Sequence, residues 1–196
     1  MDNQKLLQDN PKEEKKKNEI WEWSKALIIA VLLAFLIRTF LFAPFVVDGT
    51  SMMPNLHDRE RLIVTKLVYY LEQPKRGEIV VFHATKERDY IKRVIAVGGD
   101  KIEVKNDQLY INDKPVDEPY LNEYRKQAHE QGVPLTGDFD RPIVVPNGEI
   151  FAMGDNRRNS KDSRIIGTVK LEEVVGRADV VFWPLSAFRF PNKTDK

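Results

Sequence analysis

Residues 89–111, DYIKRVIAVGGDKIEVKNDQLYI, decide the fold class, because short apolar runs follow one another with only turns between them. Three such runs, all rich in β-branched residues, occupy residues 90–97, 101–105 and 108–111. The dipeptide Asn106-Asp107 between the last two runs favours a tight hairpin. This stretch therefore predicts consecutive antiparallel strands.

The same pattern continues on both sides of this stretch. Further short β-branched and aromatic runs occupy residues 61–65, 78–82, 142–145, 149–153 and 178–182. No long amphipathic helix pattern separates them, which argues against an alternating α/β fold. We therefore predict a mostly β protein, in which residues 44–196 form an antiparallel sheet core. The polar, proline-containing residues 112–140 are expected to form a small second subdomain or an excursion from the sheet.

The N-terminal part of the chain has a different composition. Residues 26–37 are twelve consecutive apolar residues, and the apolar segment extends to Ala43 with two polar interruptions. About 20 residues are needed to cross the hydrocarbon core of a bilayer, so we predict one transmembrane helix at 24–43. Six lysines lie between Lys5 and Lys25, five of them in the tail at 1–23, and by the positive-inside rule they place this basic, solvated tail in the cytoplasm.

This orientation predicts a single-pass protein of the cell membrane whose residues 44–196 lie outside the cytoplasm. Two other interpretations of the apolar segment stay open. One is a buried core helix, which would explain a run of about 10–14 residues. The other is a cleaved signal peptide, which Leu41 and Pro44 disfavour, because cleavage after Ala43 needs small residues at −1 and −3.

The overall composition excludes several kinds of site. The chain has 196 residues and no cysteine, which rules out disulfides, thiol catalysis and cysteine-ligated metals. Lys and Arg total 31 against 30 for Asp and Glu, and this balance argues against a nucleic-acid-binding surface. His57, His83 and His129 lack metal-ligand spacing. We therefore expect no metal, no cofactor and no nucleic-acid partner.

The first cluster with chemical potential is DGTSMMPN, residues 48–55. Gly49 allows a backbone conformation with positive φ, and Pro54 stiffens the exit of the turn. Such a turn can present the hydroxyl and the backbone N–H of Ser51 to a substrate carbonyl. From these residues alone, an ordinary turn with a solvated serine is the simpler interpretation.

The second cluster is the strand pattern around Lys92. Alternation along a strand places Lys92 and Arg93 on opposite apolar faces. The expected neighbours are Tyr90, Val94 and Ala96 on the face of Lys92, and Ile91, Ile95 and Val97 on the face of Arg93. Desolvation lowers the pKa of a lysine and converts it into a neutral base. The alternative is an edge-strand lysine whose ammonium group reaches the solvent.

The third cluster is MGDNRRNSKDSRIIG, residues 153–167. A polar turn rich in Asp and Asn is the simpler interpretation of this segment. The spacing also allows Asp162 to pair with Arg164, and it allows Ser160 to hydrogen-bond a nearby amine. Such contacts would hold a catalytic base in position.

A serine nucleophile needs a base, and His57 and Lys92 are the candidates. His57 lies six residues after Ser51, but no carboxylate is placed to orient it, since Asp58 would point elsewhere. The Gly-x-Ser-x-Gly and Ser-x-x-Lys motifs of other serine hydrolases are absent at Ser51. We therefore favour a pair formed by Ser51 and Lys92, 41 residues apart, which is chemically sound without an aspartate.

Three segments in this order resemble the motif boxes of bacterial type I signal peptidases, also called leader peptidases. They are SMMP at 51–54, KR at 92–93 with GD at 99–100, and GDNRRNSKDSR at 154–164. The single anchor resembles the Gram-positive form, and the resemblance extends from about Ala26 to Trp183. It implies a β-rich catalytic core with a small second subdomain, in agreement with the strand pattern.

The resemblance also implies roles for individual residues. Ser51 matches the nucleophile and Lys92 matches the general base, and the Ser51 backbone N–H is implied as an oxyanion donor. Ser160 matches the hydroxyl that orients the lysine amine. Asp162 and Arg164 match the supporting salt bridge.

The substrate side of the site follows from the same resemblance. Some members carry, at the position of Gly49, a serine that donates to the oxyanion, so we expect Thr50 or water to contribute here. The pocket for small substrate side chains is expected to be lined by Val47, Met52, Pro54, Leu56, Tyr90 and Ile91. An apolar surface that holds the site beside the bilayer is expected to include Phe42, Phe45, Trp183, Leu185 and Phe188.

The function implied is that of a membrane-bound serine endopeptidase that removes signal peptides from exported preproteins after Ala-x-Ala-type sites. Its expected partners are preprotein signal peptides and membrane lipid, and the secretion translocon is a further candidate. One alternative is a catalytically inactive, membrane-tethered binding module of the same fold. Another is a self-cleaving regulator with a Ser–Lys pair, for which a DNA-binding N-terminus would be expected instead of an anchor.

Overall fold

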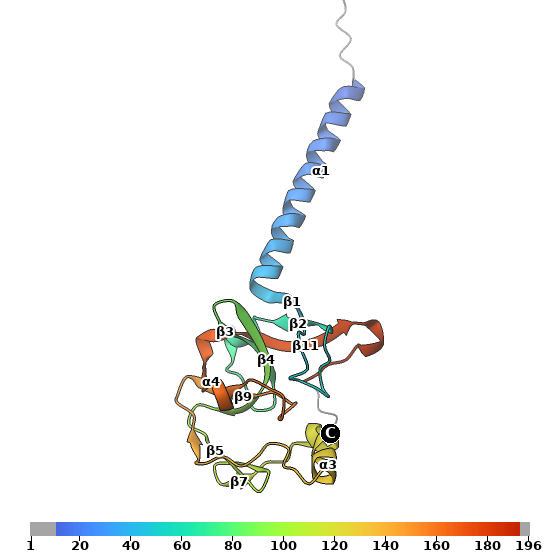
Figure 1. Cartoon of the computed structure of the whole chain (residues 1–196). Coiled ribbons are helices and arrows are strands. Elements are labelled where there is room, and N and C mark those ends of the chain that lie inside the picture. The colour runs from blue at the N-terminus through green and yellow to red at the C-terminus, as the bar shows by residue number, and fades with distance from the viewer. Residues whose placement is uncertain (1–10, 193–196) are drawn as a thin grey trace, which may run out of the picture. The chain divides into compact units, whose positions relative to one another are not determined.

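The computed structural model describes residues 11–192, and the chain divides between Phe40 and Leu41 into a helical unit and a β-rich unit (Figure 1). The helical unit contains α1 (Pro11–Leu36), which continues into the π-helical turn η1 (Ile37–Leu41). Part of the predicted tail is therefore helical, because the Lys and Glu residues that follow Pro11 are good helix formers next to an apolar helix. Residues 1–10 lie outside the described residues.

The segment Glu19–Leu41 is long and apolar enough to cross a membrane. Its 23 residues contain a window with a mean hydropathy of 2.1, and none of that window is buried. The helical conformation ends at Leu41, whereas the predicted span extends to residue 43. Phe42 and Ala43 instead belong to a strand, because they pair with Thr65 and Val64 of the neighbouring strand.

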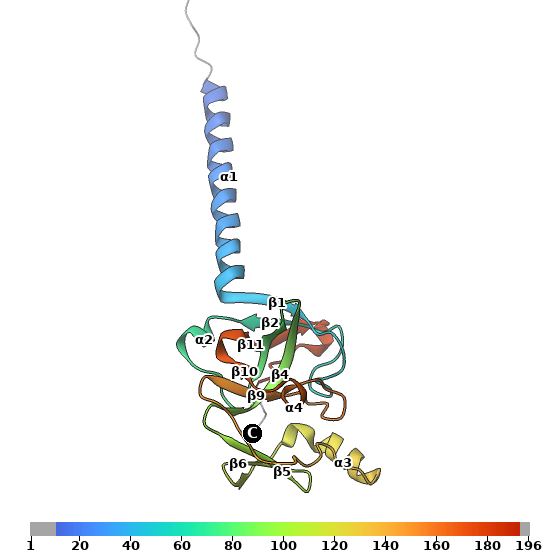
Figure 2. The ribbon, with the colours of Figure 1, turned by 60° about the vertical axis from the view of Figure 1, so that its left-hand side comes forward.

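Seven strands form the main sheet in the order β1-β2-β11-β3-β4-β9-β10, and every neighbouring pair is antiparallel. Their bounds are β1 (Phe42–Val46), β2 (Arg61–Thr65), β3 (Ile79–Thr85), β4 (Arg88–Val97), β9 (Glu149–Met153), β10 (Val169–Lys170) and β11 (Val174–Trp183). Figure 2 shows β4 and β9 near the centre of the β-rich unit. The predicted antiparallel architecture is confirmed.

A second, smaller sheet has the order β7-β6-β5-β8. Its strands are β5 (Lys101–Lys105), β6 (Gln108–Ile111), β7 (Lys114–Pro115) and β8 (Ile143–Val144). Asn106 and Asp107 have positive φ values of 48° and 61°, as a tight hairpin between β5 and β6 requires. Asn112 and Asp113 repeat this turn before β7, a hairpin that was not predicted.

The predicted excursion at 112–140 contains a helix as well as the end of this sheet. The helix α3 (Asn122–Glu130) follows a 3-10 turn, η2 (Pro119–Leu121). Leu121, Ala128 and Leu135 form a small buried cluster beneath α3. The remaining short helical segments are α2 (Val68–Leu71), α4 (Ser163–Ile166), η3 (Leu171–Glu173) and η4 (Leu185–Ala187).

Strand β4 departs from simple alternation at one point. Its pairing with β9 shifts register between Val94 and Ala96, which marks a β-bulge or irregularity there. As a result Ile95 and Ala96 belong to the same buried cluster, whereas Val97 packs with the cluster that contains Val94. The predicted face assignments of Ala96 and Val97 are therefore wrong, since a bulge reverses the alternation beyond it.

Candidate active site

Ser51 lies in a turn that follows β1, and hydrogen bonds from the backbone N–H groups of the turn hold its shape. Gly49 has a φ of +91°, a conformation that favours glycine. Its N–H donates to Asp58 Oδ1 at 2.8 Å. The N–H of Met53 donates to the carbonyl of Thr50 at 3.1 Å. The turn therefore has a defined shape before any substrate binds.

The loop after β9, residues 154–162, holds this turn from the other side. Asn156 donates its backbone N–H to the Ser51 carbonyl at 3.0 Å and its side-chain amide to the Thr50 carbonyl at 3.1 Å. Asn159 donates to Thr50 Oγ1 at 3.1 Å. The sequence predicts a polar turn rich in Asp and Asn here, and the contacts of the two asparagines with the Ser51 turn go beyond that prediction.

Gly154 allows the loop to approach this closely. A Cβ atom at position 154 would lie 2.5 Å from the Ser51 carbonyl oxygen and 2.2 Å from Ser160 Oγ. Real Cβ atoms do not approach backbone atoms so closely, so a side chain here would push the loop away from the turn. The glycine is thus needed for packing.

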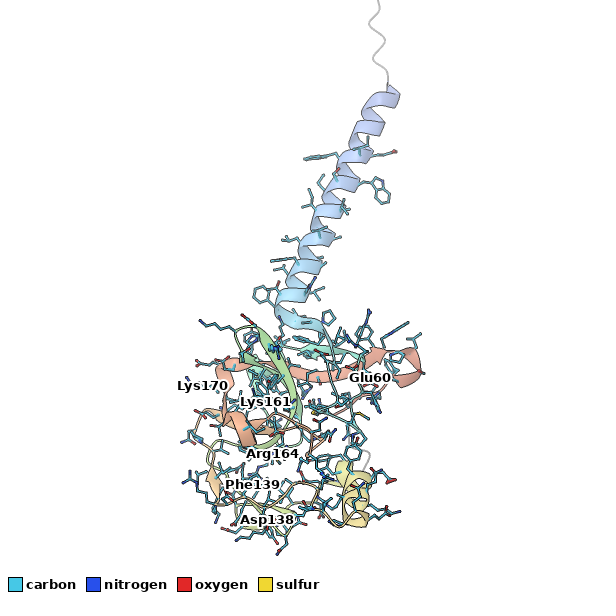
Figure 3. The ribbon with its side chains drawn as sticks, in the orientation of Figure 1. Glu60, Asp138, Phe139, Lys161, Arg164 and Lys170 are labelled. Atoms are coloured by element: carbon cyan, nitrogen blue, oxygen red, sulfur yellow. The ribbon has the colours of Figure 1, made fainter. Side chains whose placement is uncertain are left out.

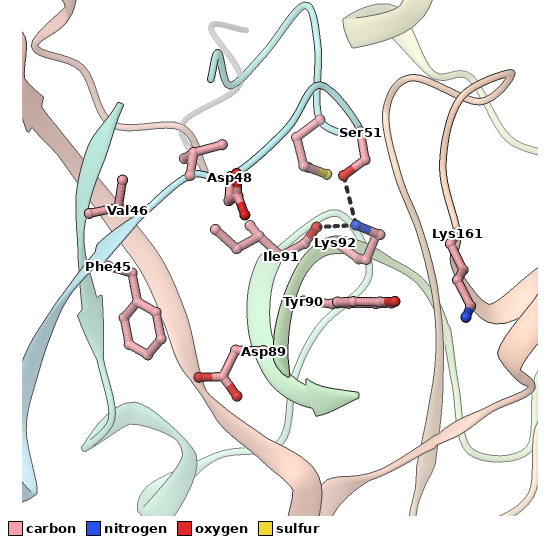
Figure 4. Close-up of a pocket in the computed structure, with 11 residues that line it drawn as sticks. Phe45, Val46, Asp48, Ser51, Asp89, Tyr90, Ile91, Lys92 and Lys161 are labelled. Atoms are coloured by element: carbon pink, nitrogen blue, oxygen red, sulfur yellow. Dashed lines mark hydrogen bonds between the residues drawn. The ribbon is translucent and has the colours of Figure 1, made fainter. Parts of the chain in front are cut away.

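Lys92 reaches Ser51 from β4 (Figure 4). Its side chain is buried, with 3% of the residue exposed, and Nζ lies 2.8 Å from Ser51 Oγ. The same nitrogen donates to the Ile91 carbonyl at 2.8 Å and lies 5.1 Å from the centre of the Tyr90 ring. Burial lowers the pKa of Lys92 to about 8, although the carboxylates of Asp162 and Asp155 partly oppose this.

Asp162 and Arg164 form a two-point ion pair, with both N–O distances at 2.8 Å. Asp162 also accepts the backbone N–H of Gly154 at 2.9 Å and caps the short helix α4. Burial by itself raises the pKa of Asp162, but Arg164 and the Gly154 N–H outweigh it, so the pKa lies below its ordinary value. Ser160 also helps to lower this pKa, because its buried Oγ lies close to the Asp162 carboxylate. Among the residues whose side chains are described, Ser160 Oγ makes no hydrogen bond to Lys92, so the implied bond is not formed in this geometry.

Arg93 and Asp155 make a second buried ion pair close to the site, which was not predicted. Arg93 donates to the two Asp155 oxygens at 2.9 and 2.7 Å, and Asn55 donates to Asp155 at 2.9 Å. A further buried pair joins Arg157 of the loop to Glu118 before α3. These contacts tie the loop to the strand and to the excursion.

A cavity of about 280 Å³ opens beside Ser51 and Lys92 (Figure 4). Four of the predicted pocket residues line it, namely Val47, Met52, Tyr90 and Ile91. Leu56 does not, because it is fully buried in the core cluster beneath Val47 and Met52, and Pro54 also lies outside the lining. Further lining residues are Phe45, Val46, Asp48, Asp89 and Lys161.

His57 lies away from this arrangement. Its ring faces Glu60 at 3.6 Å, and its side chain is more than half exposed. Asp58 accepts the Gly49 N–H and does not orient the imidazole. Within the part of the chain whose side chains are described, no group of three His, Asp or Glu residues is arranged to hold a metal ion.

The geometry is that of a serine and a buried amine in contact beside a cavity lined by both apolar and charged side chains. The family model for signal peptidases of peptidase family S26 matches residues 20–183. The chain is 52% identical over 182 residues to the Signal peptidase I of Bacillus licheniformis, which covers 92% of this chain and 96% of that relative. The chain belongs to the type I signal peptidases.

A second relative and one solved structure are also similar to this chain. Signal peptidase I T of Bacillus subtilis is 50% identical over 177 residues, or 89% of this chain and 91% of that protein. A crystal structure of a signal peptidase I from Enterococcus faecalis is 33% identical and matches with a TM-score of 0.49, covering 54% of this chain and 97% of that one. The predicted family is confirmed, and with it the activity of a peptidase that removes signal peptides from preproteins.

Proposed function

We propose that this signal peptidase is a membrane-bound serine endopeptidase in which Ser51 is the nucleophile and Lys92 the general base. The observation that carries the proposal is the 2.8 Å contact between Lys92 Nζ and Ser51 Oγ in a buried position. An amine with a pKa of about 8 is partly neutral at physiological pH, so it can accept a proton. A pKa near the working pH is what general base catalysis requires.

The reaction proceeds in two steps. Neutral Lys92 accepts the Ser51 hydroxyl proton while Oγ attacks the carbonyl carbon before the cleavage site. When the tetrahedral intermediate collapses, the carbon–nitrogen bond breaks and the Lys92 ammonium protonates the leaving amine. A water molecule then attacks the acyl ester and gives its proton to Lys92. When the ester carbon–oxygen bond breaks, the Lys92 ammonium passes this proton to Ser51 Oγ, which releases the signal peptide and restores the pair.

The oxyanion that forms in each step needs donors. We infer that the Ser51 backbone N–H is one of them, since it donates to no acceptor among residues 19–192, whose side chains are described. The Gly49 N–H is already bound to Asp58. Thr50 Oγ1 accepts a hydrogen bond from Asn159, so its own proton is available as a second donor.

Specificity for small side chains is inferred from what the cavity has to hold. Val47, Met52 and Ile91 provide apolar walls, and the volume of about 280 Å³ must take the substrate backbone together with its side chains on either side of the scissile bond. Larger side chains would overpack such a pocket, which typically costs about 1–3 kcal/mol. We therefore infer cleavage after Ala-x-Ala-type sequences.

Membrane attachment is the remaining part of the proposal. Glu19–Leu41 would form the span, with the lysine-rich N-terminus in the cytoplasm and the β-rich residues from 44 onward outside. The β-rich unit itself exposes large apolar side chains around η4, including Trp183, Leu185 and Phe188. Such side chains suit contact with the interfacial region of a bilayer. Phe45, in contrast, is half-buried and lines the cavity.

The proposal is tested with a synthetic peptide that carries Ala-x-Ala before the scissile bond and the full chain in detergent. The wild type should cleave at that bond, whereas S51A and K92M should show no cleavage above background. K170M, at an exposed lysine outside the cavity, is the matched control and should cleave at the wild-type rate. Cleavage by K92M at the wild-type rate contradicts the Ser–Lys pair, and an inactive wild type favours the binding module.

A further inference from the structure

The cavity beside Ser51 carries opposite charges at its two sides. Asp48 and Asp89 lie on one side, and Lys161 lies on the other, with Ser51 and Lys92 between them (Figure 4). This polarity does not follow from the catalytic pair, which needs none of the three charged residues. It therefore bears on which substrates the cavity accepts.

The substrate can run through the cavity in only one direction if Ser51 is the nucleophile. Three apolar lining residues, Phe45, Val46 and Ile91, lie on the side of Asp48 (Figure 4). The small side chains before the scissile bond must occupy this apolar part. The residues after the scissile bond consequently leave Ser51 towards the opposite side, where Lys161 lies.

Lys161 has a fixed backbone and a free side chain. Its neighbour Asp162 is held by Arg164 and by the Gly154 N–H, so the loop cannot move easily at this point. The Lys161 side chain is exposed, and it forms no ion pair with any residue from 19 to 192. The Lys161 ammonium group is thus carried by a backbone position that is held in place beside the cavity. It is suited to bind a carboxylate of the substrate.

The carboxylates on the opposite side reinforce this direction. Asp89 is paired with His83 at 2.6 Å, and Asp48 lies beside the Ser51 turn. Both repel acidic side chains from the part of the cavity that takes the signal peptide. Acidic residues are thus favoured after the scissile bond and disfavoured before it.

We propose that Lys161 is a specificity-determining residue that contacts the first residues of the mature protein and favours acidic side chains there. The proposal rests on the assignment of Ser51 as nucleophile and deepens it by naming the preferred substrates. Those substrates are preproteins with an Ala-x-Ala site followed directly by Asp or Glu.

The experiment uses three peptides that differ only at the two residues after the scissile bond, which are both Glu, both Lys or both Gln. For the wild type, kcat/KM should be about twofold to fivefold higher for the Glu peptide than for the Lys peptide, the range expected for exposed charge pairs. K161Q should bring this ratio close to one, and K161E should reverse it. Raising the ionic strength from about 0.05 M to about 0.5 M should reduce the wild-type ratio.

K170E is the matched control, since it makes the same charge change at an exposed lysine that does not line the cavity (Figure 3). Its ratio should equal that of the wild type. A K161E ratio equal to the wild-type ratio overturns the proposal, and so does an equal change in K161E and K170E. Failure of the catalytic assignment would look different, because the Gln peptide would then remain intact with the wild type or be cleaved by S51A.

Discussion

Lys92 and Arg93 are neighbours on β4, and both are almost fully buried, with exposed fractions of 3% and 2%. Arg93 donates to both oxygens of Asp155 and to the Gly77 carbonyl, and its guanidinium stacks 4.0 Å from the centre of the Tyr120 ring. The hydrogen bonds of Lys92 within residues 19–192 go to neutral oxygens, those of Ser51 and Ile91. The two cations are therefore equally buried, but the pKa of Lys92 is lowered whereas the pKa of Arg93 is raised.

The difference lies in the carboxylate partner. Burial lowers the pKa of both groups, but for Arg93 the adjacent Asp155 more than compensates, so its pKa is raised. For Lys92 the nearest carboxylates, Asp162 and Asp155, act from a distance and compensate only in part. A paired buried cation stays charged, and loss of one partner leaves the other charge buried and unpaired, whereas an unpaired buried amine loses its proton readily and becomes a base.

The largest effect should come from removing the unpaired cation. K92M should lower kcat/KM for an Ala-x-Ala peptide by a thousandfold to about ten-thousandfold, because Ser51 loses its only base. Single-turnover cleavage assays would measure this. The conservative variant K92R should be equally inactive, since a guanidinium does not deprotonate at accessible pH, and a K92R enzyme with high activity would contradict the role of a neutral amine.

Removing the paired cation should instead damage the fold. R93M leaves Asp155 buried without its partner, and we expect a loss of about 3–5 kcal/mol in the free energy of unfolding. Urea unfolding of the full chain would measure it. The double variant R93M/D155L should recover most of the loss, and a single variant as stable as the wild type would show that the pair is not needed.

K92M should change stability in the opposite direction. Below pH 8, folding buries a protonated Lys92 against its preference, and the shift from 10.5 to about 8 corresponds to roughly 3 kcal/mol. K92M should therefore be more stable than the wild type at pH 7, by about 2 kcal/mol after the lost hydrogen bonds are included. The gain should shrink between pH 8 and 10.5, where the folded wild type releases its proton. Equal stabilities at pH 7 would argue against a destabilised amine.

The smallest effect concerns the pH dependence of catalysis. In the wild type, kcat/KM should rise about tenfold per pH unit up to about pH 8 and then level off, because only neutral Lys92 is competent. D162N removes a carboxylate that raises the pKa of Lys92, so the midpoint should move to lower pH by less than about one unit. H57Q should leave the profile unchanged, and a midpoint that depends on His57 would point to a different base.

The sequence predicts that Lys92 and Arg93 point to opposite faces of one strand. It does not predict that Arg93 has a carboxylate partner and Lys92 has none in contact. Local pattern located β2, β5, β6 and β9 at their observed bounds and placed Lys92 and Arg93 on opposite faces. The partner of Arg93 lies 62 residues away, and nothing local to either residue indicates that they meet. The bulge between Val94 and Ala96 was missed for the same reason, since it arises from the pairing of β4 with β9.

Other differences have equally physical causes. The helix α3 lies in a polar, proline-containing segment, where propensity alone is a weak guide and packing on Leu121 and Leu135 decides. The contacts of Asn156 and Asn159 with the Ser51 turn join segments about a hundred residues apart. The packing role of Gly154 becomes visible only when the turn and the loop are seen together.

The second sheet and α3 leave the main sheet after β4 and return before β9, two strands that are themselves neighbours. Their points of departure and return are fastened together, because the Gly99 N–H donates to the Val145 carbonyl and the Val145 N–H donates to the Asp100 carbonyl. Residues 101–144 thus form an insert, here called the cassette, whose two ends are joined by backbone hydrogen bonds. Hairpin tips within the cassette can lengthen during evolution or accept a fused peptide tag, while the strands that carry Lys92 and the loop around Ser160 keep their spacing.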